Sequence, residues 1–134
     1  MGMNKAGQNQ QVDSSGGSVK LTQWTPRDGY PGTIISPQSE LLPNGSGSVV
    51  VHCGIQLELG WNDLTAPLVV ELMYNESPFA RDQFRTGQAA LVLKDAPLTV
   101  APGGRIWVRM STTATLRKAQ VLPGANTYVA YDPA

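Results

Sequence analysis

The residues from Val49 to Gly60 alternate between apolar side chains and mostly polar or small ones, and this alternation constrains the fold more than any other feature of the chain. The apolar positions are Val49, Val51, Cys53, Ile55, Leu57 and Leu59. A period of two places successive side chains on opposite faces of a strand, so all of these residues are expected to point into a core. One buried face and one largely wet face are typical of an antiparallel sheet and not of a parallel sheet covered on both sides.

Similar alternating stretches recur along the chain and are separated by turn residues. They include Leu68–Asn75, Ala89–Leu93, Arg105–Ser111 and Thr127–Tyr131. Roughly eight short strands, with a turn about every ten residues, predict an all-β antiparallel β-sandwich of jelly-roll-like type. One stretch differs, because Ser77 and Pro78 have the residue types of a helix N-cap and first helical position, which predicts a short helix ending before Gly87.

The first residues have a different composition from the rest. Residues 1–17 are rich in Gly, Gln, Asn and Ser and have few large apolar side chains. Such a segment cannot bury enough surface to offset the entropy lost on ordering. We therefore predict a flexible polar N-terminal arm at 1–17, which is either a frayed end or an arm that orders against a partner, and a single β-sandwich domain at 18–134.

Charge and residue types exclude several function classes. The 10 Lys and Arg residues balance the 10 Asp and Glu residues, which argues against nucleic-acid binding and polybasic membrane binding. No apolar run approaches the length of a membrane span, and the N-terminus has no apolar stretch typical of a secretion signal. His52 and Cys53 are adjacent on a predicted strand and so point to opposite faces, which argues against a Cys–His nucleophile pair. We expect no catalytic residues, no metal, no cofactor and no enzymatic activity.

The strand from Arg105 to Met110 carries the most informative surface pattern. Ile106, Val108 and Met110 share the core register, which places Arg105, Trp107 and Arg109 together on the opposite face. Trp and Arg are enriched in the residues that contribute most to protein–protein binding. The alternatives are a Trp shielded by the arginine side chains, a second packed layer, or a platform for a sugar ring.

Trp24 and Tyr30 lie in a Pro- and Gly-rich segment beside the predicted arm. They either attach this arm to the domain or dock a partner, and the sequence leaves both roles open. We include them with Arg105, Trp107 and Arg109 as candidate protein-interface residues.

Three features together resemble the capsid decoration, or cement, proteins of tailed bacteriophages. They are the polar arm at 1–17, the Pro- and Gly-rich stretch Trp24–Pro43 and the neutral, turn-rich β region Ser48–Asp132. The resemblance has no signature motif. It implies a virion structural protein that binds the major capsid protein lattice, self-associates as a homotrimer, and is assembled in the host cytoplasm.

The alternative function is a small carbohydrate-binding β-sandwich module, in which Trp24, Trp61 and Trp107 would stack on sugar rings. A sugar platform needs exposed aromatic rings beside polar hydrogen-bonding groups, and Asn62 and Asp63 supply such groups next to Trp61. A small jelly-roll hydrolase is disfavoured, because a single His does not provide a full ligand or catalytic set.

Overall fold

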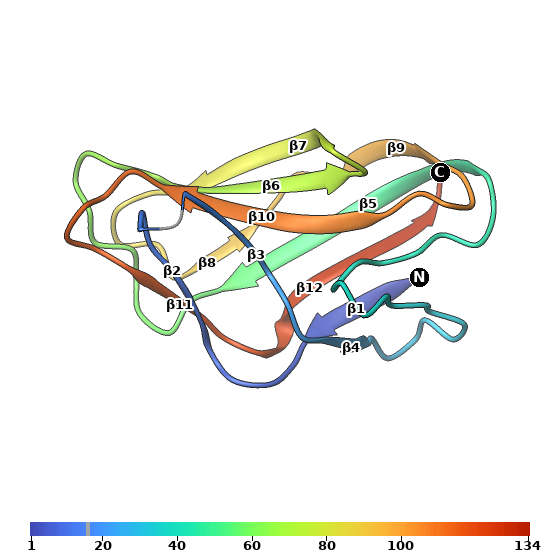
Figure 1. The fold of residues 1–134 in the computed structure, drawn as a ribbon, viewed down its shortest axis with the longest axis horizontal. Coiled ribbons are helices and arrows are strands. Elements are labelled where there is room, and N and C mark those ends of the chain that lie inside the picture. The colour runs from blue at the N-terminus through green and yellow to red at the C-terminus, as the bar shows by residue number, and fades with distance from the viewer. Residues whose placement is uncertain (16) are drawn as a thin grey trace.

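Antiparallel strands form all the regular secondary structure of residues 1–15 and 17–134, which are the residues that the computed structural model describes (Figure 1). In chain order the strands are β1 (Gly2–Lys5), β2 (Gln10–Val12), β3 (Ser18–Lys20), β4 (Trp24–Pro26), β5 (Gly47–Gln56), β6 (Leu68–Tyr74), β7 (Ser77–Phe84), β8 (Ala90–Val92), β9 (Ala96–Val100), β10 (Ile106–Thr112), β11 (Ala119–Val121) and β12 (Gly124–Pro133). The described residues include no helix long and apolar enough to cross a membrane.

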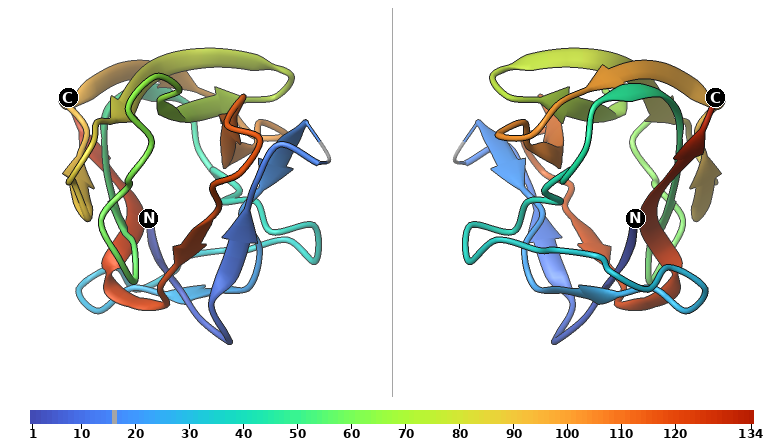
Figure 2. Two further views of the ribbon diagram at one scale, coloured as in Figure 1. Left: turned by 90° about the vertical axis from the view of Figure 1, so that its left-hand side faces the viewer. Right: turned by 90° about the vertical axis from the view of Figure 1, so that its right-hand side faces the viewer.

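Two sheets face each other and enclose the core. The β5 sheet has the order β4-β1-β12-β5-β8, with β9 also paired to β5, and the β10 sheet has the order β3-β10-β6-β7. A short ribbon of β2 and β11 lies at one side. The end-on views show the strands surrounding a single interior (Figure 2). The predicted all-β antiparallel sandwich is therefore confirmed.

The alternation along β5 is confirmed over most of its length. Val49, Val51, Cys53, Ile55 and Leu57 are all buried. The prediction is wrong at Leu59, whose side chain is 78% exposed. The reason is that β5 ends at Gln56 and Leu57 makes only an isolated bridge to Val121, so the chain has left the sheet before Leu59.

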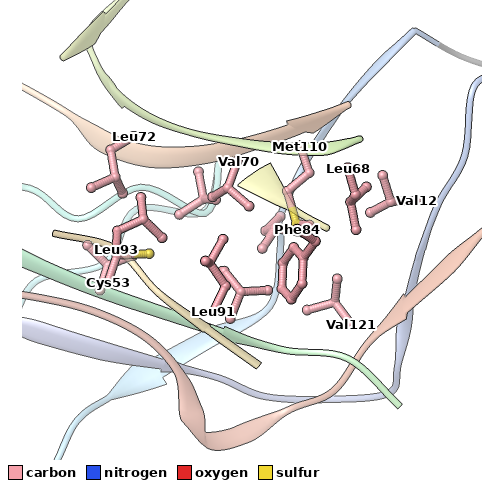
Figure 3. Close-up of a cluster of buried hydrophobic side chains, with 14 of the residues drawn as sticks. Val12, Cys53, Leu68, Val70, Leu72, Phe84, Leu91, Leu93, Met110 and Val121 are labelled. Atoms are coloured by element: carbon pink, nitrogen blue, oxygen red, sulfur yellow. The ribbon is translucent and has the colours of Figure 1, made fainter. Parts of the chain in front are cut away.

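The interior is filled from both sheets. Met110 and Phe84 from the β10 sheet lie in one apolar cluster with Cys53 and Leu91 from the β5 sheet (Figure 3). Along β10 every second residue is buried, from Ile106 to Thr112. Because this register is strict, the side chains between them must face away from the core.

The N-terminal segment differs from the predicted flexible arm. β1 pairs with both β12 and β4, and Met3 has no exposed surface. β2 pairs with β11, and Val12 is fully buried. The polar composition of this segment did not reveal that it forms strands. A strand whose backbone groups are paired with two neighbours needs only one or two buried apolar side chains. The part of the predicted arm at residue 16 lies outside the described residues.

The predicted helix after Ser77 is wrong, because these residues form β7. β7 pairs with β6 from Ser77 to Phe84, with one register irregularity opposite Leu72 and Met73, and Phe84 at its end is fully buried. Asn75 adopts a positive φ of 56° in the turn between the two strands, a conformation that Asn tolerates better than most residues. Pairing with β6 and burial of Phe84 outweigh the local signal for a helix start.

Candidate functional site

Arg105, Trp107 and Arg109 lie together on the outward face of the β10 sheet, as the alternation predicts. All three are half-buried, whereas Ile106, Val108 and Met110 between and after them are fully buried. We call these three outward residues the Trp107 ridge. The ridge is one continuous surface feature, because residues two apart on one strand point the same way.

Two neighbours fix the position of the Trp107 ring. Its Nε1 donates a hydrogen bond of 2.8 Å to the carbonyl oxygen of Asn75, in the turn between β6 and β7. Lys20 Nζ lies 4.7 Å from the ring centroid, which is cation–π geometry. Trp107 is therefore ordered before any partner arrives.

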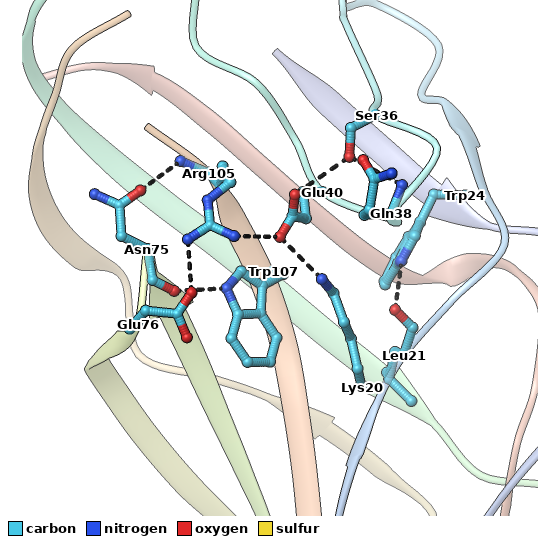
Figure 4. A network of polar contacts seen from close by, with 10 residues as sticks. All are labelled: Lys20, Leu21, Trp24, Ser36, Gln38, Glu40, Asn75, Glu76, Arg105 and Trp107. Carbon is cyan, nitrogen blue, oxygen red and sulfur yellow. Dashed lines mark hydrogen bonds and ion pairs between the residues drawn. The ribbon is translucent and has the colours of Figure 1, made fainter. Parts of the chain in front are cut away.

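Glu40 connects the ridge to a long loop. Its side chain is 4% exposed, and its Oε2 accepts hydrogen bonds from Lys20 Nζ at 2.9 Å and from Arg105 Nη1 at 3.0 Å (Figure 4). Arg105 Nη2 also donates to Glu76 Oε1 at 2.7 Å. Burial acts to raise the pKa of Glu40, but the hydrogen bonds and charges of its basic neighbours lower it overall. Glu40 is thus an ionised carboxylate at neutral pH that holds two cations in place.

Arg109 is fixed in the same way at the other end of the ridge. Its Nε and Nη2 lie 3.1 and 3.0 Å from Glu71 Oε1 on the neighbouring strand β6. The strand register aligns Lys20, Arg109, Glu71 and Arg81 in one row across the whole β10 sheet. The side chains of this row are all charged, and most of them form ion pairs with a neighbouring side chain. Trp107 lies adjacent to the row.

The other two candidate interface residues do not join the ridge. Trp24 is 8% exposed, and its Nε1 donates to the carbonyl oxygen of Leu21 at 3.0 Å, so it packs as a core residue. Tyr30 lies against the β5 sheet instead, where its hydroxyl group donates to Asp132 Oδ2 at 3.1 Å. In these positions the two side chains hold their own segment, residues 24–30, against the domain.

His52 and Cys53 point to opposite faces of β5, as predicted. Cys53 is 1% exposed, and burial raises the pKa of its thiol to about 12. His52 lies on the outward face between Asp95 and Asp132, with Nδ1 2.8 Å from one carboxylate and Nε2 3.2 Å from the other. The two side chains cannot act as a nucleophile and its base.

Within residues 1–15 and 17–134, no group of three or more His, Cys, Asp or Glu side chains could hold a metal ion.

The tryptophans proposed as a sugar platform are separated by the fold. Trp24 is in the core, and Trp61 is 2% exposed with its Nε1 bonded to the carbonyl oxygen of Ala66 at 2.9 Å. Trp61 does border an open hollow of about 370 Å³, which polar residues such as Gln83 and Thr86 also line. Of the three tryptophans, Trp107 alone is half-buried, and the other two are buried.

Sequence reasoning missed the acidic partners of the ridge. Glu71 could have been found, because it sits in the outward register of an alternating strand. Glu40 had no such signal, since it lies in an irregular loop far from Arg105 in sequence. Lys20 likewise becomes a neighbour of Trp107 only through the pairing of β3 with β10.

No protein-family model matches this chain, and no curated protein matches it. Solved structures do share its fold. GITRL from bushbaby is 19% identical, with a TM-score of 0.50, over 81% of this chain and 80% of that one. Eiger TNF from S. frugiperda is 13% identical, with a TM-score of 0.53, over 96% of each chain. At these identities the likeness shows the fold alone, a jelly-roll-like β-sandwich.

Proposed function

We propose that this protein is a non-enzymatic virion structural protein that binds and stabilises a capsid lattice through protein–protein contacts. The Trp107 ridge is its lattice-binding surface. The observation that supports this role most directly is the ordered state of the ridge, in which ion pairs or hydrogen bonds hold all three side chains.

An ordered ridge favours protein binding for an energetic reason. Immobilising a flexible side chain at an interface costs roughly 0.5–1.5 kcal/mol. Arg105, Trp107 and Arg109 already have fixed partners, so much of this cost falls on folding and not on binding. Trp and Arg are also among the residue types most enriched in the positions that dominate binding energy.

Self-association as a homotrimer is part of the same proposal. A decoration protein meets a lattice at points of local symmetry, and a symmetric oligomer presents several identical ridges at once. Multivalent binding strengthens attachment without any new type of contact. The protein would then act in the virion, after assembly in the host cytoplasm.

The test is co-sedimentation with purified capsids that lack the protein. Trp107→Ala should weaken binding by more than about 2 kcal/mol, roughly 30-fold in Kd. Leu116→Ala is the matched control, because Leu116 is 90% exposed on a loop outside the ridge. Circular dichroism must show that both variants retain the β fold. Equal capsid binding by the two variants would refute the assignment of the ridge.

Carbohydrate binding stays as the second candidate, because the hollow beside Trp61 contains side chains suited to hydroxyl groups. A glycan screen run in parallel separates the two functions. Binding to a glycan that is lost in Gln83→Ala and Thr86→Ala, together with no affinity for capsids, would favour the carbohydrate-binding module.

A further inference from the structure

The outward face of the β10 sheet continues past the Trp107 ridge into an open hollow. The strand pairing places one further row of outward residues after the row of Arg109, and it contains Ser18, Ser111, Val69 and Gln83. A hollow of about 440 Å³ is lined by residues of this row together with Arg81. Its volume lies within the roughly 300–1,000 Å³ that is usual for ligand pockets. We call it the Arg81 hollow.

The lining combines an apolar residue with hydroxyl groups. Val69 is 8% exposed and does not belong to the apolar cluster of the interior, because it lies in the outward register of β6. Ser18, Ser111 and Thr113 also line the hollow. Ser18 and Thr113 are exposed and Ser111 is half-buried, so a ligand in the hollow has access to their hydroxyl groups.

Arg81 supplies the charge of this hollow, and the other lining residues are uncharged. Its side chain is exposed, and none of the ion pairs found among the described residues includes it. Glu71 lies opposite Arg81 on β6, but its Oε1 already accepts from Nε and Nη2 of Arg109. Asp82 lies in the opposite register of β7, and its Oδ1 accepts from the backbone N–H of Gln83. The Arg81 guanidinium therefore has donors for an incoming anion.

An arginine beside hydroxyl groups has the chemistry that recognises a carboxylate. A guanidinium pairs with the two oxygens of a carboxylate through two parallel hydrogen bonds, and hydroxyl groups donate to the lone pairs that remain. A free phosphate ion would use the same donors. The position of the hollow favours a carboxylate that belongs to a protein partner, because the hollow and the Trp107 ridge share one face of the sheet.

The spacing of the two features fits a single extended segment. Ser111 follows Trp107 by four residues on β10, which corresponds to roughly 13 Å along a strand. Residues four apart in an extended partner segment span the same distance and project to the same side. A segment that runs along β10 therefore contacts the Trp107 ring and the Arg81 hollow at once.

We propose that the Arg81 hollow binds an acidic side chain of the lattice partner, carried by the same extended segment that packs on Trp107. The Asp or Glu carboxylate pairs with Arg81 and accepts hydrogen bonds from the hydroxyl groups of Ser111 and Thr113. A residue about four positions away in the partner covers the Trp107 ring. This inference rests on the proposed function, since it names the chemistry of the partner that the ridge binds.

Co-sedimentation with purified capsids that lack the protein tests the proposal on the full chain. Arg81→Glu should weaken binding by roughly tenfold or more, because it places one carboxylate against another. Lys94→Glu is the matched control: it makes the same change in net charge at an exposed position between β8 and β9, away from the β10 sheet. It should bind like the wild type. Equal binding by the two variants would overturn the proposal.

A peptide titration followed by nuclear magnetic resonance tests the hollow without capsids. A hexaglutamate peptide should shift the backbone amide signals of Ser18, Ser111 and Thr113, and a hexaglutamine peptide should not. The shifts should disappear in Arg81→Glu and persist in Lys94→Glu. Equal shifts with both peptides, no shift with either, or shifts with inorganic phosphate alone would overturn the proposal.

The two experiments separate this inference from the proposed function. Capsid binding that depends on Trp107 but is unaffected by Arg81→Glu refutes only the acidic partner segment. Binding of hexaglutamate that depends on Arg81, in a protein without affinity for capsids, refutes only the capsid as the partner.

Discussion

Met3→Ala measures whether the N-terminal segment is part of the fold. Met3 has no exposed surface and lies on β1, between β12 and β4. The substitution removes three side-chain heavy atoms, which corresponds to about 2.4 kcal/mol at ~0.8 kcal/mol for each buried methylene-sized group. The cavity left behind adds to this loss, so the free energy of unfolding should fall by about 2–5 kcal/mol. A flexible arm would lose almost nothing.

Equilibrium unfolding in urea is the assay, with the midpoint as the readout and an unchanged m-value as the sign that the folded state is otherwise intact. Gln8→Ala is the control within the same segment, because Gln8 is exposed. It should change stability by no more than about 0.5 kcal/mol. If the two variants unfold at the same urea concentration, Met3 does not anchor β1 in the core, and the segment behaves as the arm that its composition predicts.

Three further outcomes follow from burial and charge. Leu57→Ala should lower the free energy of unfolding by about 2–5 kcal/mol, while Leu59→Ala should change it little. If urea titrations show comparable losses of stability for the two variants, β5 extends past its observed end. Cys53 should resist thiol reagents from pH 7 to 9, because its raised pKa of about 12 keeps the buried thiol protonated; rapid labelling of the native protein would contradict this. Glu40 has a lowered pKa in the folded state, so its contribution to stability is present above its unfolded pKa and is lost as pH falls through the folded value. Glu40→Gln should therefore be less stable than the wild type at pH 7 and nearly equal to it in acid, and a constant difference across this range would argue against the ion pairs with Lys20 and Arg105.

Alternation alone predicted the strands that their own pattern of apolar and polar residues identifies, whichever strands they pair with. β10 could be placed residue by residue, and β5 as far as Leu57, because a period of two in side-chain polarity has one structural solution when one face is buried. The same reasoning placed Arg105, Trp107 and Arg109 on one surface. It also placed Cys53 in the core and His52 outside it.

Elements stabilised mainly by their neighbours could not be predicted in this way. The sequence of β1 has the composition of a flexible tail. Its order comes from backbone pairing with β12 and β4, which its own residues do not reveal. β7 begins with residues that favour a helix start, and only pairing with β6 makes it a strand. Leu59 continues the alternating pattern although the sheet has already ended.

The sequence by itself therefore determined the fold class, the main core strands and the composition of the ridge, because these depend on local periodicity. The tertiary structure decided which charges meet. Glu40 contacts Arg105, and Asp95 contacts His52, only after strands far apart in the chain have paired. The same pairing places the Tyr128 ring over Gly54. Such contacts depend on sheet order and register, and no local pattern in a single sequence encodes them.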